Sequence, residues 1–363
     1  MVINAWSHTD AGSRMSNALS DNEIPSNAPG ETAAWKKALP VIRVAGTIIM
    51  FYVLVTKVQW SSLGQIGKKG VGLILIAFLA TLLGIVLSGV RWQRVLDALE
   101  VPSRMRDLVE LQLAGMFAGN FLPSTVGGDV VRATWLAKVN KATSDSIASV
   151  VLERLTGWLV LPVLVLAGTL TDPSIWHLGA VSKLIVYVAA ATLVGLVAIL
   201  ALARSANLSA RASKSAVVAG FLDAVYRGVG KFGRKPASLA RLLGWAFLYQ
   251  LCVLVASIFA ARALDISIGW RELMVFVPAV AMLQVLPLTI GGLGIREGAL
   301  VLMLHPLGIG SAQAIAFGLL VYALNIAASL FGAPSFALGS RRMLRRAHVA
   351  AATPGNARRE TSC

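Results

Sequence analysis

Three pairs of oppositely charged residues lie beside or inside long apolar runs of the sequence. They are Asp129 with Arg132, Glu153 with Arg154, and Arg296 with Glu297. Ionisable side chains at membrane depth are costly, and they commonly mark the path of a substrate or a proton. A guanidinium group matches phosphate oxygens bidentately, and a carboxylate can balance its charge or take up a proton. The pairs therefore predict a site for an anionic headgroup.

Two of these pairs end a motif that occurs twice. Leu, Pro, Thr, a Gly-Gly pair and Arg recur at identical offsets in residues 122–132 and 286–297. Pro and Gly disfavour a continuous helix, so each copy predicts an interrupted membrane segment. Such interruptions at corresponding places in two halves of a chain are typical of transporter binding sites. A helix that restarts after a break presents free N–H groups to an anion. The glycines that would allow close approach are Gly127, Gly128, Gly291 and Gly292.

The same residues also have a structural interpretation. Neighbouring Arg and acidic side chains can neutralise one another and fix helix packing, and for a single pair this interpretation is slightly favoured. The recurrence of Arg after Gly-Gly favours function for Arg132 and Arg296. Asn120, Gln284 and Asn325 are of a type that more often forms interhelical hydrogen bonds than binds ligands. Asn120 is nevertheless included among the candidate binding residues.

Catalytic motifs find little support. The sequence has no zinc-ligand spacing, no Gly-x-Ser-x-Gly elbow and no Gly-Lys-Ser/Thr nucleotide loop. Cys252 and Cys363 predict neither a disulfide framework nor a metal site. We therefore expect no catalytic residue, no metal and no cofactor, and we favour a transporter over an enzyme.

Composition places the chain in a membrane. Hydrophobic residues make up 56% of it and charged residues only 14%, which a soluble core of ordinary proportions cannot accommodate. Windows of about 20 residues at 71–90, 184–203 and 242–261 carry no charge and are long enough to cross a bilayer. The net charge of +16 comes mainly from Lys and Arg between apolar runs and at the C-terminus. That is the positive-inside pattern, so we expect no nucleic-acid partner.

The predicted fold is an all-α polytopic bundle of about 6–8 transmembrane helices. We expect a disordered cytosolic tail at 1–34, a transmembrane domain at 35–345 and a second cytosolic tail at 346–363. Six helices are predicted at 39–56, 71–90, 147–170, 183–203, 241–262 and 312–338. This arrangement places the basic loops, Arg91 and Arg94 among their charges, on one face with both termini. Glu153 and Arg154 are expected where their helix opens.

Two apolar stretches, 108–126 and 273–309, contain the repeated motif. Each could enter the membrane and return to the face it left, and the two copies would then be inverted relative to each other. Alternatively, 273–290 and 298–310 are complete spans and the bundle has eight helices. Either arrangement places the breaks inside the bundle, because irregular backbone at membrane depth must avoid lipid.

These motifs resemble the lysylphosphatidylglycerol synthase transmembrane-region family, also called flippase-like membrane proteins. The resemblance rests on Gly119-Asn120-Phe121-Leu122-Pro123-Ser124, Gly127-Gly128-Asp129, Glu153-Arg154 and residues 286–297, and it extends over most of 39–340. It implies an integral inner-membrane protein that moves, or helps to make, lipids with anionic, aminoacylated or glycosylated headgroups. In the best-known relatives this region translocates aminoacylated phosphatidylglycerol and precedes a cytosolic synthase domain. Only about 23 residues follow Ser340 here, so we expect translocation without aminoacyl transfer.

The favoured function is a lipid flippase or transporter with membrane lipids as partners. Arg132, Arg154 and Arg296 would hold the headgroup, and Asp129, Glu153 and Glu297 would balance those charges or take up protons. The alternative is an enzyme or enzyme subunit of lipid, polyprenyl-phosphate or hopanoid biosynthesis. A third hypothesis is a scaffold that recruits a lipid-biosynthesis enzyme through the basic loop at 204–240.

Overall fold

The computed structural model describes residues 68–120, 127–140, 142–205, 226–230, 236–284 and 295–339. These residues form helices and no strands, which confirms the predicted all-α class. Five helical segments among them are long and apolar enough to cross a membrane. They are α4 (Lys68–Ala98), α7 (Thr143–Thr171), α8 (Ala180–Ser205), α10 (Pro236–Ala263) and α13 (Ser311–Ser329), the last continued by η5 (Leu330–Gly332) and α14 (Ala333–Leu338). The predicted helix at 39–56 and both predicted tails lie outside the described residues.

Four shorter helices flank the repeated motif. They are α5 (Met105–Gly119), α6 (Gly127–Asn140), α11 (Trp270–Leu283) and α12 (Ile295–Leu304). At 1.5 Å per residue, α11 is about 21 Å long and α12 about 15 Å, against about 30 Å of hydrocarbon. As far as the described residues go, neither helix is long enough to cross the membrane alone. The predicted breaks fall within residues 121–126 and 285–294, which lie outside the described residues.

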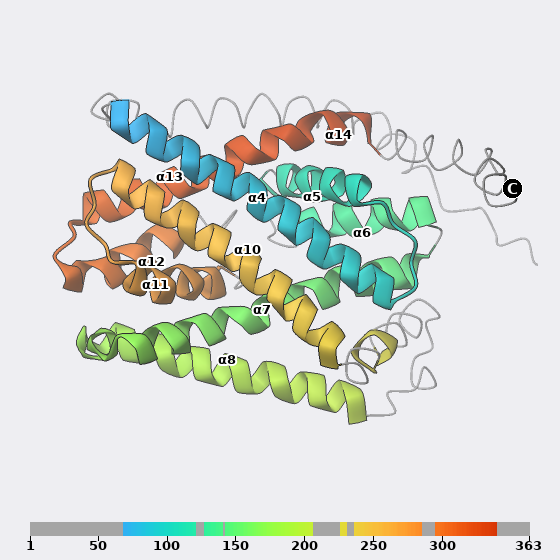
Figure 1. The fold of residues 1–363 in the computed structure, drawn as a ribbon, viewed down its shortest axis with the longest axis horizontal. Coiled ribbons are helices and arrows are strands. Elements are labelled where there is room, and N and C mark those ends of the chain that lie inside the picture. Colours follow the sequence, from blue (N-terminus) through green and yellow to red (C-terminus); the bar gives the residue numbers. More distant parts are fainter. Residues whose placement is uncertain are drawn as a thin grey trace, which may run out of the picture. The chain divides into compact units, whose positions relative to one another are not determined.

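The two short pairs pack at opposite ends of the long helices. α5 and α6 share a core with the C-terminal part of α4 and the start of α10, through residues such as Trp92 and Leu242. α11 and α12 share theirs with the N-terminal part of α4 and the last turns of α7, through Ala77 and Val165. We call these the first end and the second end. In Figure 1 they lie on the right and on the left.

This arrangement is the one that an inverted repeat requires. The chain runs along α4 to the first end, through α5 and α6, and back along α7. It later runs along α10 to the second end, through α11 and α12, and back along α13. The chain therefore runs through the two halves in opposite directions. The first long helices of the two halves, α4 and α10, pack side by side (Figure 1).

Two glycines allow backbones to approach closely around α5. A Cβ atom at Gly128 of α6 would lie 2.3 Å from the carbonyl oxygen of Gly115, and one at Gly332 would lie 2.2 Å from that of Leu113. Both distances are far below van der Waals contact, so only glycine fits at either position. α5 is thus held between α6 and the segment that continues α13.

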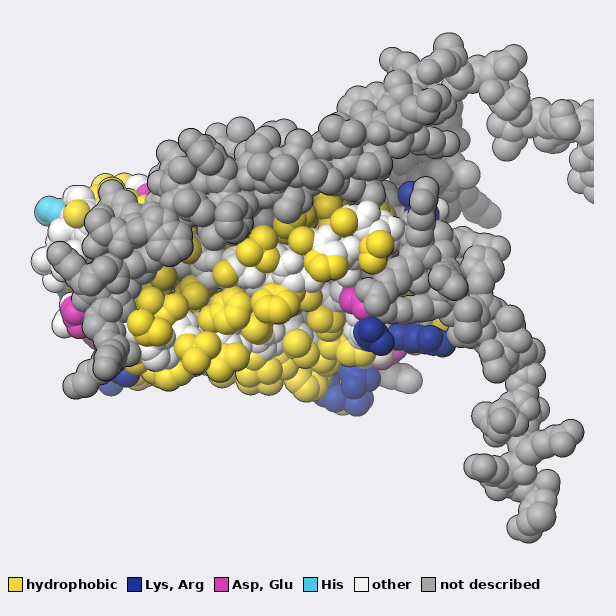
Figure 2. Space-filling model, turned by 90° about the horizontal axis from the view of Figure 1, so that it is seen from above, with side chains coloured by type: hydrophobic (Ala, Val, Ile, Leu, Met, Phe, Trp, Pro, Cys, Tyr) yellow, Lys and Arg dark blue, Asp and Glu magenta, His cyan; other side chains and the backbone are white. Residues whose placement is uncertain are grey.

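The outer surface of the bundle is apolar. Leu79, Val194 and Leu302 are all more than half exposed. Figure 2 shows hydrophobic side chains over the middle of one face, with Lys and Arg at its margins. Such a surface fits the hydrocarbon of a bilayer, whereas polar side chains would be expected to cover a soluble protein.

Candidate functional site

Glu153 is the centre of a buried ion-pair network at the first end. Its side chain is 1% exposed. Oε1 accepts hydrogen bonds from Arg91 and from the Ser88 hydroxyl at 3.3 Å, and Oε2 accepts one from Arg132 Nη2 at 3.3 Å. α4, α6 and α7 are thereby joined through one carboxylate.

The prediction that Glu153 and Arg154 open their helix was wrong. α7 begins at Thr143, so Glu153 lies about three turns inside it. Several residues of the earlier turns, Ser146 and Ser149 among them, are buried although these turns are not strongly apolar. The Ser149 hydroxyl accepts a hydrogen bond from Trp92 Nε1 of α4 at 3.0 Å. Hydropathy therefore placed the start of the helix too late.

Arg91 is the functional candidate that the sequence interpretation missed. It was counted among the basic loop charges, but α4 continues to Ala98 and buries Arg91 to 5% exposure. Its guanidinium lies 5.3 Å from the centroid of the Tyr249 ring, and Gly157 leaves room for it, since a Cβ there would lie 2.8 Å from Nη1. A helical face that continues through Ser88, Arg91 and Val95 is the signal that could have identified it.

Asp129 links the other two arginines of the first end. It accepts from Arg132 Nη1 at 3.1 Å and from Nε and Nη2 of Arg154, both at 2.9 Å. Arg132 is 2% exposed and lies 4.2 Å over the Trp92 ring, whereas the Arg154 side chain is 47% exposed. The predicted pair of Asp129 with Arg132 is present. Adjacent Glu153 and Arg154 instead point about 100° apart on their helix and bind different partners.

Arg296 and Glu297 form the ion pair of the second end. Arg296 donates to Glu297 Oε1 from Nη2 at 2.5 Å and from Nε at 3.1 Å. Its guanidinium carbon lies 4.6 Å from the centroid of the Tyr322 ring. The candidates Gly291 and Gly292 lie outside the described residues. Arg296 therefore resembles Arg132 in having both a carboxylate partner and an aromatic ring.

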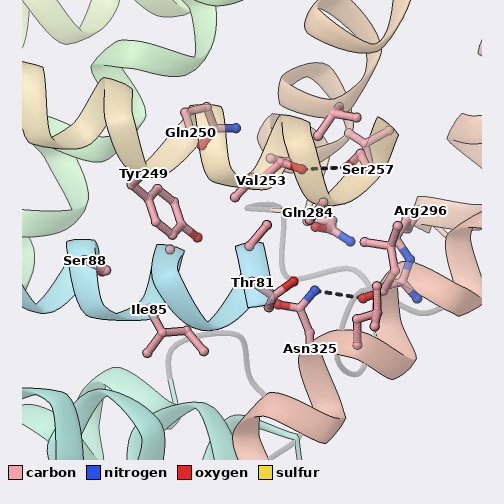
Figure 3. Close-up of a pocket in the computed structure, with 18 of the residues that line it drawn as sticks. Thr81, Ile85, Ser88, Tyr249, Gln250, Val253, Ser257, Gln284, Arg296 and Asn325 are labelled. Atoms are coloured by element: carbon pink, nitrogen blue, oxygen red, sulfur yellow. Dashed lines mark hydrogen bonds between the residues drawn. The ribbon is translucent and has the colours of Figure 1, made fainter. Parts of the chain in front are cut away.

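Two cavities with partly polar linings lie beside these groups. The central cavity, of about 240 Å³, lies between α4, α5, α10, α11, α12 and α13, and its lining includes Ser88, Tyr249 and Arg296 (Figure 3). The first-break cavity, of about 250 Å³, is lined by Asp129 and Arg154 among others. Both cavities are lined by Gln112, Met116, Gln284 and Asn325. The arginines of the two ends thus border adjoining polar spaces inside the bundle.

Asn120 and Gln284 occupy equivalent positions in the two halves. Each is the residue that caps the C-terminus of the short helix before a break, and both line the first-break cavity. The side chain of Asn120 donates to Ser329 Oγ at 2.9 Å, an interhelical bond of the expected kind. Asn325 instead donates to Val321 within its own helix.

The candidate glycines before Asp129 differ in their surroundings. Gly127 begins α6, and it is not among the described residues that line either cavity. Gly128 borders the first-break cavity, but it is buried against Gly115 of α5. Its close contact with α5 explains the need for glycine there without a ligand.

The charge balance of the site is positive. Arg91, Arg132, Arg154 and Arg296 supply four positive charges, and Asp129, Glu153 and Glu297 supply three negative ones. Within the described parts of the chain, no three His, Cys, Asp or Glu side chains gather as a metal site would require. The arrangement is suited to an anion inside an apolar bundle.

Long apolar helices around a charged interior define a multi-pass membrane protein. The chain belongs to the lysylphosphatidylglycerol synthase transmembrane-region family, whose model matches residues 41–332. That family places it among membrane proteins of lipid metabolism. No curated protein and no solved structure matches the chain.

Proposed function

We propose that this chain is a lipid translocase of the inner membrane that carries the anionic headgroup of a lipid through the bundle. The observation that supports this most is that Arg154 and Arg296, one from each half of the repeat, line two cavities that share part of their lining. A phosphate in hydrocarbon would lose many kcal/mol of hydration, so its passage needs polar partners at membrane depth. Guanidinium groups from the two halves of the repeat supply them.

Arg154 is the residue best placed for first contact with a headgroup. Its side chain is 47% exposed while Arg132 and Arg91 behind it are 2% and 6% exposed. The buried pair and Glu153 hold α4, α6 and α7 in register, and Asp129 orients Arg154 toward the first-break cavity. In this proposal the buried network positions the binding group, and Arg154 binds the phosphate.

The central cavity then offers the next partners. Its lining reaches from Ser88 to Ala80 along α4, eight residues or about 12 Å, and includes Arg296. That is about two fifths of the hydrocarbon thickness. Passage across the remainder would require the two short helix pairs to move in turn, since each closes a different end of the bundle. Broken helices at opposite ends are suited to such alternating access.

The test is lipid movement by the full chain in liposomes. The probes are phosphatidylglycerol and a polyprenyl-phosphate hexose, each with a fluorophore on its tail, and dithionite quenching reports transfer between leaflets. We expect the wild type to move at least one probe, and Arg154→Gln and Arg296→Gln to reduce the rate at least tenfold. Arg94→Gln is the control, because it removes an arginine that lies near the C-terminal end of α4 and is about half exposed. Wild-type rates in folded Arg154 and Arg296 variants would exclude this mechanism.

The lipid profile of cells with and without the gene separates translocation from synthesis. A translocase leaves its lipid intact but stranded in the inner leaflet, whereas loss of an enzyme or enzyme subunit removes a lipid species. We expect an unchanged set of species with altered leaflet distribution. Disappearance of a species would favour the biosynthetic alternative. The same cells test the inner-membrane location and the cytosolic termini through fusion of reporter tags to either end.

A further inference from the structure

Uncharged polar side chains line the central cavity, and we call them the neutral wall; their chemistry bears on which lipid headgroup the site would bind. The polar residues of the central cavity, other than Arg296, carry no full charge. They include Thr81, Gln250, Ser257, Gln284 and Asn325. Amides and hydroxyls offer both donors and acceptors to uncharged polar groups, such as the hydroxyls of glycerol or of a sugar. The Tyr249 hydroxyl adds a further group of the same kind (Figure 3).

The carboxylates of the site are already engaged by arginines. Asp129 accepts three hydrogen bonds from Arg132 and Arg154. Glu153 is held by Arg91 and by the same Arg132, and Glu297 accepts two bonds from Arg296. An ammonium group on a headgroup would have to displace a guanidinium from one of these pairs. It would also enter a site whose described charges sum to a positive value. An anion must compete with these carboxylates for the arginines, but it enters a site of net positive charge, and its uncharged hydroxyls need no carboxylate partner.

The sequence of the breaks does not change this balance. Residues 121–126 and 285–294 contain no Asp, Glu, Lys, Arg or His. The excess of one positive charge over the described site therefore does not depend on side chains from the breaks. It arises at the first end, where Arg91, Arg132 and Arg154 face two carboxylates, while Arg296 and Glu297 balance each other at the second end.

We propose that the site selects a phosphate-bearing lipid with an uncharged, hydroxyl-rich headgroup and discriminates against headgroups that carry amino groups. This inference rests on the proposed function and narrows its substrate. Phosphatidylglycerol and phosphate-linked glycolipids fall inside the selected class. Lysyl-phosphatidylglycerol falls outside it, because its two amino groups outweigh the single phosphate charge and give the headgroup a net positive charge. The arginine of each half binds the phosphate, and the neutral wall binds the hydroxyls.

The experiment compares rates of leaflet transfer in the same liposomes. The labelled lipids are phosphatidylglycerol, the polyprenyl-phosphate hexose and lysyl-phosphatidylglycerol. The selectivity ratio is the rate of the faster of the first two divided by that of the third. We expect a ratio of roughly ten or more, which corresponds to a difference of about 1.4 kcal/mol in the activation free energy of transfer. A ratio of one or less overturns the selectivity and leaves translocation standing. Absence of transfer for all three lipids overturns translocation and the selectivity with it.

A charge introduced into the wall provides the second measurement. Gln284→Glu and Gln250→Glu are nearly isosteric, and each adds one negative charge to the wall of the central cavity. Each should lower the selectivity ratio several-fold by admitting the cationic headgroup. Gln284→Asn and Gln250→Asn are the matched neutral controls and should keep the wild-type ratio. If one Glu variant fails to fold, the other decides. A wild-type ratio in a folded Glu variant would refute selection by charge.

Discussion

Neutralising Glu153 is expected to destabilise the bundle strongly. Glu153→Gln keeps the shape of the side chain but removes the negative charge that Arg91 and Arg132 share. Both guanidinium groups would stay buried, at 6% and 2% exposure, and only Asp129 would still pair with Arg132. Removing one partner of a buried ion pair costs about 3–5 kcal/mol, because the other charge is left without compensation.

The matched control is Asp97→Asn, the same exchange of carboxylate for amide on the exposed surface of α4. Asp97 pairs with Arg94 at 3.4 Å, and both side chains are about half exposed. Solvent screens such a pair, so the expected loss is only about 0–1 kcal/mol. A second variant, Glu153→Gln with Arg91→Met, removes one unpaired charge and should recover part of the lost stability. The comparison separates burial of charge from loss of a hydrogen bond.

The assay is reversible unfolding in mixed micelles, with each variant compared with the wild type at the same protein and detergent concentrations. We expect Glu153→Gln to unfold at clearly lower denaturant, Asp97→Asn to follow the wild type, and the double variant to lie between them. If Glu153→Gln is as stable as Asp97→Asn, the carboxylate is not what holds α4, α6 and α7 together. In that case the account of the network as the support for Arg154 fails as well.

Two further predictions concern packing and pH. Gly128→Ala and Gly332→Ala should each cost about 1–3 kcal/mol, because the added Cβ meets backbone; Gly195→Ala in α8, with open space around it, should be neutral or stabilising in the same unfolding assay. Hydrogen bonds from Ser174 lower the pKa of Asp172, which lies just beyond α7. Its stabilising contribution is present above the usual Asp range near about 3.9 and is lost as pH falls through the lowered pKa. The stability difference between wild type and Asp172→Asn should therefore shrink at acid pH, and a constant difference would contradict this.

Most of the helical framework was predictable because the bilayer imposes strong constraints on length and hydropathy. The windows at 71–90, 183–203 and 241–262 all lie within observed helices. What hydropathy misses is helix that continues beyond the apolar core. α4 and α7 both extend well into segments with polar or charged residues, since protein rather than lipid surrounds those turns.

The partners within the site were less predictable than its members. Asp129 with Arg132, and Arg296 with Glu297, follow from spacing on one helix. The bonds from Arg91 to Glu153 and from Arg154 to Asp129 join different helices, so local spacing does not encode them. Arg91 directly follows an apolar window, and hydropathy therefore predicts a loop position for it, whereas α4 continues to Ala98. Tertiary packing determines such assignments.

The two halves of the repeat share a backbone plan but differ in charge, and that difference bears on direction under the proposed function. Position 129 of the first copy is Asp, whereas the equivalent position 293 of the second is Leu. Arg132 is consequently held by two carboxylates and a tryptophan ring, while Arg296 has one adjacent carboxylate and a tyrosine ring. A phosphate would compete with fewer bonds at Arg296 than at Arg132. The second end should therefore exchange its anion more readily, and the more firmly bound first end should keep its geometry while Arg154 alone meets the lipid.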